Sequence, residues 1–460
     1  MRHVMVMAST GAVGLIAVFA VDLINLFYIS LLGEKPIAAA VGFSGVVGFL
    51  QASIAIGMMI GVGAVVSRTI GAGRMADARR IASGSLIVLA AIMAVLAALT
   101  LTELQPLLRA LGAQEDTRAL ATQFLTIAVP SVPLMSAGMC CSALLRSVGD
   151  ARRAMNVTLY AAVATAALDP ILIFGLHLGL TGAAISTVLS RCVLAFVGWR
   201  GVRGVHDLVG RPSLAVLPDD MRAVFTVSGP AVLSNLATPV GAAFVTSSMA
   251  VFGPAAVAGQ ATIDRLSPVA FGLVYALSGS VGPILAQNLG AGRPDRVRRA
   301  LRDSFLFMVA AVCAAWALLA AAQPLVVLAF HAEGVTADLI RLFCSFLAGA
   351  FLFNGALFVG NAVFNNLGYP MLSTLFNWGR ATLGTIPLVW FGAHYGPLGV
   401  LSGQAAGSAM FGTGAAITAF ALVRRLDLRA EARHEGAVPV VGGSGQAALV
   451  VMAGRPVSPH

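Results

Sequence analysis

The sequence predicts an all-α polytopic membrane protein, and three observations lead to that prediction. The first is hydropathy: 58% of the 460 residues are hydrophobic, only 10% are charged, and the mean hydropathy is +0.90. A typical soluble domain carries about 25% charged residues, so this chain could not cover a water-exposed surface. The second is a series of long apolar stretches, and the third is an internal repeat. Fifty glycines favour closely packed helices over the alternating strands of a membrane barrel.

Twelve apolar stretches are long enough to cross a bilayer, for which roughly 20 residues are needed. We expect each to be an α-helix, because backbone polar groups in lipid must form hydrogen bonds within their own segment. The first six run near 4–32, 37–67, 81–101, 120–145, 156–176 and 182–199, and the second six near 223–251, 257–288, 304–330, 338–364, 372–393 and 398–423. The start of the first stretch resembles a signal peptide, but the stretch continues past Asp22, so we expect a span.

The two sets of six spans are repeats of each other. The motif Gly-Ala-Gly-Arg at 71–74 recurs at 290–293, an offset of 219 residues, and further glycines and a proline match at nearly the same offset. Because six is even, both halves enter the membrane from the same side. We therefore expect two six-helix bundles related by a pseudo-twofold axis along the membrane normal. The predicted units are an amino-terminal lobe at 1–207, a carboxy-terminal lobe at 208–424 and a loose cytoplasmic tail at 425–460.

Basic residues predict the orientation. The net charge is +10, Lys35 is the single lysine, and the arginines cluster between the apolar stretches. Twenty-two basic residues fall on the side that holds both termini, and four fall on the other side. Positive residues mark the cytoplasmic side, so we predict a multi-pass protein of the plasma (inner) membrane with both termini cytoplasmic. Clusters placed in this way indicate membrane topology, so we expect no nucleic acid partner.

Catalytic machinery is not visible in the sequence. The seven histidines lie in loops or termini, no HExxH motif is present, and the Gly-Ala-Gly-Arg turns lack the Gly-Lys-Ser/Thr of a phosphate-binding loop. We therefore predict that the protein is not an enzyme and uses neither metal, cofactor nor ATP.

Two carboxylates deep in the first half are the main candidate site. A charged side chain at membrane depth is costly, so it usually faces the protein interior and serves a function. Asp22 lies about two-thirds along the first span, with Asn25 on the same helix face. Asp169 precedes Pro170, a candidate hinge because proline frees a backbone carbonyl, and Thr165 is one turn earlier.

The second half has weaker candidates. Asp264 is an alternative site, although Arg265 beside it could neutralise it, and Arg380 could snorkel to the cytoplasmic surface. When the halves are aligned, Asp22 matches Ala242 and Asp169 matches Ile386, so both deep carboxylates are unique to the first half. Shared residues should build the architecture, and unique ones should build the site.

These residues together resemble the multidrug and toxic compound extrusion (MATE) family over about residues 10–423. The resemblance rests on Asp22, the Gly-Ala-Gly-Arg turn, the run Leu-Arg-Ser-Val-Gly-Asp at 145–150 and Leu-Asp-Pro at 168–170, in that order. It implies an antiporter for multidrug efflux, which exports organic cations or other xenobiotics in exchange for protons or sodium. It also implies that Asp22 and Asp169 bind the coupling ion, with Thr187 as a neighbour, and it favours the DinF-like branch of the family.

The sequence departs from the family pattern at two positions, and other functions stay open. Thr10 stands where the family usually has a proline, and Thr165 where an asparagine is common. One alternative is a lipid-linked saccharide flippase of a related fold, which would need a strongly cationic cavity. Another is a non-catalytic membrane receptor subunit or a membrane-embedded enzyme. The expected partners are small amphipathic substrates and the lipid bilayer, and we expect a monomer.

Overall fold

The computed structural model describes residues 2–31, 35–210, 212–213 and 215–435. Over this part of the chain every regular element is helical. The first half contains α1 (Arg2–Leu31), α2 (Lys35–Gly71), α3 (Met75–Thr102), α4 (Leu104–Ala110), α5 (Glu115–Ala128), α6 (Val132–Ser147), α7 (Ala151–Pro170) and α8 (Gly179–Trp199). The second half contains α9 (Leu217–Ala250), α10 (Pro254–Ala270), α11 (Gly272–Gly290), α12 (Pro294–Ala329), α13 (Gly334–Ser345), α14 (Phe351–Leu367), α15 (Pro370–Gly379), α16 (Thr385–Ala393) and α17 (Pro397–Glu435).

The expected spans are all present as helices or as joined helix pairs, so the predicted fold class is confirmed. Ten helical stretches in the described residues are long and apolar enough to cross a membrane, and the pair α10 and α11, bent by 54°, makes eleven. The twelfth is α15 with α16. A π-helical turn at Arg380–Gly384 divides it, so neither piece alone has the length of a span.

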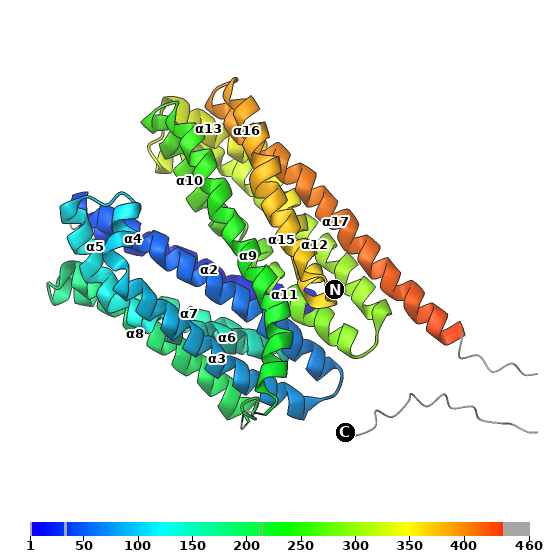
Figure 1. Ribbon diagram of the computed structural model, residues 1–460. Helices are drawn as coiled ribbons and strands as arrows, with labels where there is room; N and C mark the ends of the chain where they lie inside the picture. The colour runs from blue at the N-terminus through cyan, green and yellow to red at the C-terminus, as the bar shows by residue number, and fades with distance from the viewer. Residues whose placement is uncertain (1, 32–34, 211, 214, 436–460) are drawn as a thin grey trace, which may run out of the picture.

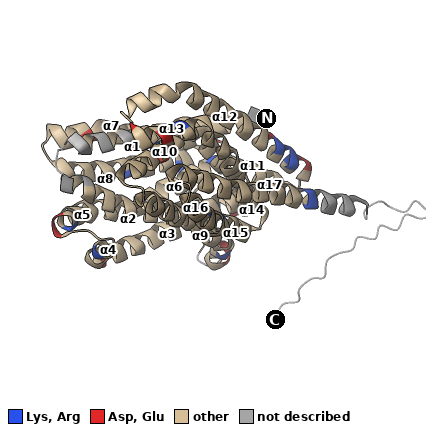
Figure 2. Cartoon of the chain, turned by 90° about the horizontal axis from the view of Figure 1, so that it is seen from above, with Lys and Arg blue, Asp and Glu red and all other residues tan. Residues whose placement is uncertain are grey.

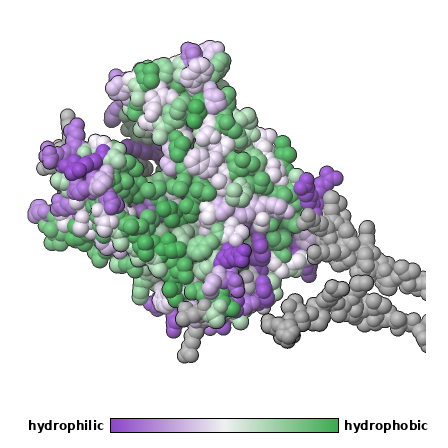
Figure 3. All heavy atoms as spheres, in the orientation of Figure 1, coloured by the Kyte–Doolittle hydropathy of each residue, from purple (hydrophilic) through white to green (hydrophobic). Residues whose placement is uncertain are grey.

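The helices form two bundles, each with its own apolar core. One core joins α2 to α8 and includes the start of α9 at Met221 and Val224. The other joins α9 to α14 with α16 and α17, and the start of α1 at Val4, Met7 and Ala8 packs into it, as does Ala151 at the start of α7. Figure 1 shows the bundles converging at the end where the N-terminus and the end of α17 lie, and diverging at the opposite end, near α5 and α13. Figure 3 shows a hollow between the bundles at that diverging end. We call these the closed end and the open end.

The outer faces of the bundles suit a bilayer. Large apolar side chains such as Leu318, Leu325 and Leu328 of α12 are exposed on the outside of the protein. Charged residues gather towards the ends of the helices, and the lengths between are nearly free of charge (Figure 2). Exposed apolar surface on this scale would be a liability in water, but it is what lipid tails require.

Small residues let the bundles approach each other closely along α2, α9 and α11. A Cβ atom on Gly57 of α2 would lie 2.5 Å from the Cα of Val232 in α9, and one on Gly61 would lie 2.8 Å from the backbone nitrogen of Ser228. The Ser228 hydroxyl donates a hydrogen bond of 3.2 Å to the carbonyl oxygen of Met58. Glycines four residues apart on one face thus form the contact between the bundles, as is common in membrane helices.

Candidate functional site

Helices α1 and α7 run parallel and pack along their length, which fixes the relative depth of their residues. Near one end, a Cβ atom on Gly14 would lie 2.5 Å from Oγ1 of Thr158. Near the other end, the rings of Tyr28 and Phe174 meet edge to face at 5.9 Å. These two contacts are 14 residues apart on α1 and 16 residues apart on the α7 side, so the helices keep almost the same register.

This register brings Asp22 and Asp169 to nearly the same depth. Interpolation between the two contacts places Asp22 level with a residue about two positions before Asp169. At the rise of an α-helix, two positions correspond to roughly 3 Å along the helix axis. Both side chains come from helices of the first bundle. The structure therefore places the two predicted carboxylates at one level, although no hydrogen bond joins them among the described residues.

Asp169 is the most unusual polar group in this region. Its side chain is 1% exposed, and neither carboxylate oxygen has a hydrogen-bond donor among the described residues. It lies at the end of α7, where Pro170 leads into a π-helical turn at Ile171–Gly175. Its one polar neighbour is Ser186 of α8, which interacts with it electrostatically but whose hydroxyl is also without a hydrogen-bond partner in the described part. A buried carboxylate without donors is costly unless it takes up a proton or a cation.

Asp22 differs from Asp169 in its surroundings. Its side chain is exposed on α1, whereas Oδ1 of Asn25, one turn further, is buried and lacks a donor among the described residues. Asp22, Asn25 and Asp169 thus place acceptor oxygens at similar depths, and those recorded as buried, Oδ1 of Asn25 and both oxygens of Asp169, lack donors among the described residues. Such a set of acceptors suits a proton or a hard monovalent cation, because the missing positive partner must come from outside the protein.

The two predicted threonine neighbours do not serve these carboxylates. The hydroxyl of Thr165 donates to the carbonyl oxygen of Ala161 at 3.1 Å, and that of Thr187 donates to Ala183 at 3.0 Å, each within its own helix. Ser186 was not among the predicted site residues, although its spacing from Ser190 was a signal. Ser190, one turn later, donates to Ala161 of α7 at 3.0 Å, so Ser186 and Ser190 form one polar stripe that faces α7.

The second bundle contains the two weaker candidates, Asp264 and Arg380. Asp264 is exposed on α10 and accepts a 2.9 Å hydrogen bond from Gln260, and no ion pair joins it to Arg265 in the described residues. Arg380 is half-buried at the start of a π-helical turn, and its charge acts on Tyr275 of α11.

Three half-buried arginines were not predicted as site residues from the sequence. Arg191 of α8 donates from Nη1 to the carbonyl oxygen of Ala128 and to Ser131, both at 2.9 Å, where prolines interrupt the helix between α5 and α6. Arg68 of α2 donates to a carbonyl oxygen of the second bundle, and Arg146 of α6 contacts the sulfur of a methionine at 3.7 Å. A single arginine within an apolar run, such as Arg191, is the signal that could have revealed them.

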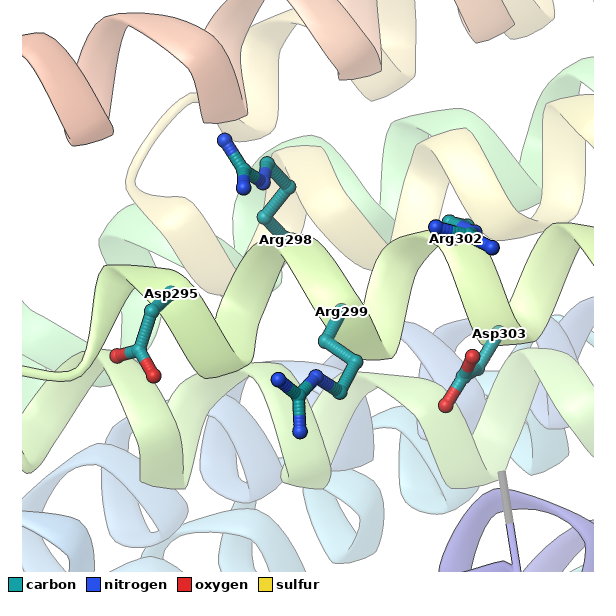
Figure 4. Close-up of a pocket in the computed structure, with 5 residues that line it drawn as sticks. All are labelled: Asp295, Arg298, Arg299, Arg302 and Asp303. Atoms are coloured by element: carbon teal, nitrogen blue, oxygen red, sulfur yellow. The ribbon is translucent and has the colours of Figure 1, made fainter.

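A separate charged hollow of about 360 Å³ lies at the closed end, on the first turns of α12. Figure 4 shows its lining residues on one helix: Asp295, Arg298, Arg299, Arg302 and Asp303. This hollow is distant from Asp22 and Asp169 in the sequence, and it lies at the end of a helix instead of at their depth. We assign it to the charged membrane-flanking surface rather than to the site.

Comparisons with known proteins agree on one family. A family model described as MatE matches residues 12–171 and 230–391, one copy in each half. An FAD transporter of Shewanella oneidensis is 31% identical over 402 residues, which cover 85% of this chain and 88% of that protein. The multidrug export protein MepA of Staphylococcus aureus is 24% identical over 279 residues, 59% of this chain and 60% of that protein. A crystal structure of the Vibrio cholerae MATE transporter VcmN in the bent form superposes with a TM-score of 0.87 at 25% identity, covering 93% and 98% of the two chains.

Proposed function

Because this chain belongs to the MATE family of transporters, which are not enzymes, we propose that it is a secondary active exporter working by alternating access. In this proposal it moves amphipathic compounds, organic cations among them, out across the plasma membrane in exchange for protons. Sodium is the alternative coupling ion. The assignment to the DinF-like branch and the cytoplasmic position of both termini are further parts of the proposal.

The observation that carries this proposal is the buried Asp169 carboxylate. Both of its oxygens lack donors among the described residues, at a depth where a bare charge costs at least a few kcal/mol. Protonation removes that cost, so the carboxylate can take a proton from one side of the membrane and release it when the site faces the other. Asp22, at nearly the same depth and more exposed, would pass the proton between water and Asp169.

The shape of the protein suits this cycle. With the positive-inside orientation, the closed end faces the cytoplasm and the hollow between the bundles opens to the outside. The described conformation then corresponds to the state that releases substrate. Closing the open end and parting the closed end would expose the same site to the cytoplasm, as in other transporters built from two repeats.

Transport by the reconstituted full-length protein tests the proposal. Proteoliposomes loaded with ethidium would receive first an imposed proton gradient and then an imposed sodium gradient of equal size. We expect ethidium transport to follow the proton gradient and to fall at least tenfold in Asp169→Asn. Transport driven by sodium alone would identify the other coupling ion. Equal transport with no gradient would contradict secondary active export.

A second substrate class has its own support. Arg68, Arg146, Arg191 and Arg380 are at least partly buried, and within the described part of the chain none forms an ion pair with an aspartate or glutamate. Four such arginines outnumber the three deep carboxylates. They favour anionic substrates, and an FAD transporter is among the relatives. Flavin nucleotides should therefore be assayed beside cationic dyes in the same proteoliposomes.

A further inference from the structure

The fifth span of each half carries one charged residue beside a π-helical turn, and the two charges are opposite. In the first half, Asp169 lies two residues before the turn at Ile171–Gly175. In the second half, Arg380 is the first residue of the turn at Arg380–Gly384. Turns of this kind are rare in helices and often mark functional sites. The repeats thus place a carboxylate in one bundle and a guanidinium in the other.

Arg380 has the features of a site that awaits an anion. Its Nε atom is buried and has no acceptor among the described residues, and no carboxylate pairs with it there. Its charge interacts electrostatically with the hydroxyl of Tyr275, and that hydroxyl also interacts with the carboxylate of Asp264. One oxygen of Asp264 already accepts a hydrogen bond from Gln260. A guanidinium with unused donors at this depth is costly until it binds an acceptor.

Tyr275, with which the Arg380 charge interacts, belongs to a cluster of aromatic rings. The ring of Tyr275 lies 5.2 Å from that of Phe358 and 5.7 Å from that of Phe351, both on α14. It also meets Phe19 of α1 edge to face at 6.2 Å, so the cluster joins the two bundles. The bend between α10 and α11 lies at Phe271, whose ring stacks on Phe351 at 4.0 Å. Interrupted helices at mid-depth between repeats are where transporters of this kind bind their substrates.

We propose that Arg380, with the ring cluster of Tyr275, Phe351 and Phe358, forms a subsite for aromatic substrates that carry a phosphate or a carboxylate. The planar guanidinium would bind the anionic group through paired hydrogen bonds, and the rings would stack on the aromatic part of the substrate. This subsite rests on the proposed export function and names its substrate class. The first bundle would hold the coupling ion and the second the anionic group of the substrate.

The test compares two flavins that share one ring system. Riboflavin has no phosphate and flavin mononucleotide has one, and binding of each to the purified full-length protein in nanodiscs is followed by flavin fluorescence. We expect the mononucleotide to bind the unaltered protein roughly 10- to 100-fold more tightly, as for a hydrogen bond to a charged group. Arg380→Gln should reduce this preference to about twofold or less, as a lost charge-assisted bond requires, while riboflavin affinity stays unchanged.

Matched variants separate the roles of charge, ring and fold. Arg265→Gln removes a nearby exposed charge and should keep the full preference, whereas Phe351→Ala should weaken both flavins alike. If Arg380→Gln does not fold, Arg380→Lys serves instead and should lose most of the preference, because lysine cannot form the paired bonds. Inorganic phosphate alone should compete only weakly with the mononucleotide.

Several outcomes would overturn the subsite. The first is an unchanged preference for flavin mononucleotide in Arg380→Gln, or in Arg380→Lys where that variant is used. The second is equal affinity of the unaltered protein for the two flavins. The third is that the unaltered protein binds neither flavin. Failure of the export proposal is distinguishable from these. Asp169→Asn should abolish coupled transport and keep the flavin preference, and a protein that binds with this preference but transports nothing would contradict export alone.

Discussion

Arg68 of the first bundle donates a hydrogen bond of 2.6 Å to the carbonyl oxygen of Asn366 in the second. Close by, the side-chain amide of Gln287 in α11 donates to the carbonyl oxygen of Ser147 in α6. Gly71 is the first residue of one Gly-Ala-Gly-Arg motif, and Gly290 is the first residue of the other. Each glycine packs directly against the backbone of the opposite bundle. The repeated Gly-Ala-Gly-Arg motif therefore forms part of the contact that shuts the closed end, in addition to the turn between two helices.

Adding one methyl group at this contact should open the closed end. A Cβ atom on Gly71 would lie 2.7 Å from the Cα of Gln287, which is backbone and cannot swing away. Overpacking of this kind costs about 1 to 3 kcal/mol, so Gly71→Ala should shift the population towards the state open at this end by roughly tenfold. The rate at which a thiol reagent labels a single cysteine at Ser280, buried between the bundles, measures the shift.

A matched glycine provides the control for that prediction. Gly229 of α9 has open space where a Cβ would lie. Gly229→Ala should leave the labelling of the Ser280 cysteine unchanged, and because Pro230 follows within the helix, we expect no gain in helix stability from the added methyl group. Equal labelling rates in Gly71→Ala and Gly229→Ala would show that the glycine contact does not set the closure.

The orientation can be tested with cysteines at both ends of the bundles. The exposed free cysteines Cys192 and Cys313 would first be replaced by serine. Because positive residues mark the cytoplasmic side, a cysteine at Ala76 or Asp295 should resist an impermeant thiol reagent in whole cells and react in inverted vesicles. Glu115, exposed at the open end, should show the reverse. Ready labelling of the Ala76 cysteine in whole cells would overturn the predicted topology.

Asp150, between α6 and α7 and outside the spans, should make stability depend on pH. Burial would raise the pKa of its carboxyl, but hydrogen bonds from the Arg153 backbone and guanidinium and from His206 outweigh burial and lower it. A lowered pKa means that the folded state favours the charged form. The stabilisation is fully present above the unfolded value of about 3.9 and is lost as pH falls through the lower folded value.

Thermal unfolding of the detergent-purified protein measures this dependence. Between pH 6 and pH 3, Tm should fall in the unaltered protein and fall less in Asp150→Asn, since the amide does not titrate. Asparagine can still cap α7 by accepting from the Arg153 N–H, so at pH 6 the variant should lose only the charge that faces Arg153 and His206 and be destabilised by less than about 1 kcal/mol. Parallel Tm curves for the two proteins would assign the pH dependence to other groups.

The fold was predictable to a large extent because lipid leaves the chain few choices. Backbone groups in a bilayer must pair within a helix, so twelve apolar runs specify twelve spans, and the repeat specifies two bundles. What the sequence could not provide was local irregularity. The bend at Phe271 follows Pro268, which marks a kink but not its angle, and no residue type identifies the π-turn at Arg380 in advance.

The candidate site was predictable in its charges but less so in its neighbours. Asp22 and Asp169 stood out because a carboxylate is rare in an apolar run. Their partners depend on which face of α8 carries a hydroxyl side chain, and a shift of one residue changes that face. Ser186 interacts with Asp169, whereas the next residue, Thr187, donates its hydrogen bond to the carbonyl oxygen of Ala183 in its own helix. From the sequence Arg380 could snorkel to the surface, and the structure adds that its charge interacts with Tyr275. Snorkelling needs a free path along the helix, and the sequence does not show whether one exists.

The last prediction concerns Asp22 and Asp169 as a coupled pair. They lie at nearly the same depth on packed parallel helices, so a proton taken up by one changes the cost of charging the other. Asp22→Asn and Asp169→Asn should each insert normally and lower proton-driven efflux at least tenfold, since an amide mimics the protonated state. Asp169→Asn should also keep or raise thermal stability, because it removes the need for a proton on a buried carboxylate. If the two act as one unit, the double variant should be little worse than either single one.

Efflux from the reconstituted protein at matched amounts measures this, with Asp264→Asn as the control. Asp264 is exposed and already bonded to Gln260, so its replacement should retain more than half of the efflux. A double variant with much less efflux than either single variant would mean that the two carboxylates carry protons independently. Near-normal efflux in both single variants would remove the pair from the mechanism, and a large loss in Asp264→Asn would then move the coupling site to the second bundle.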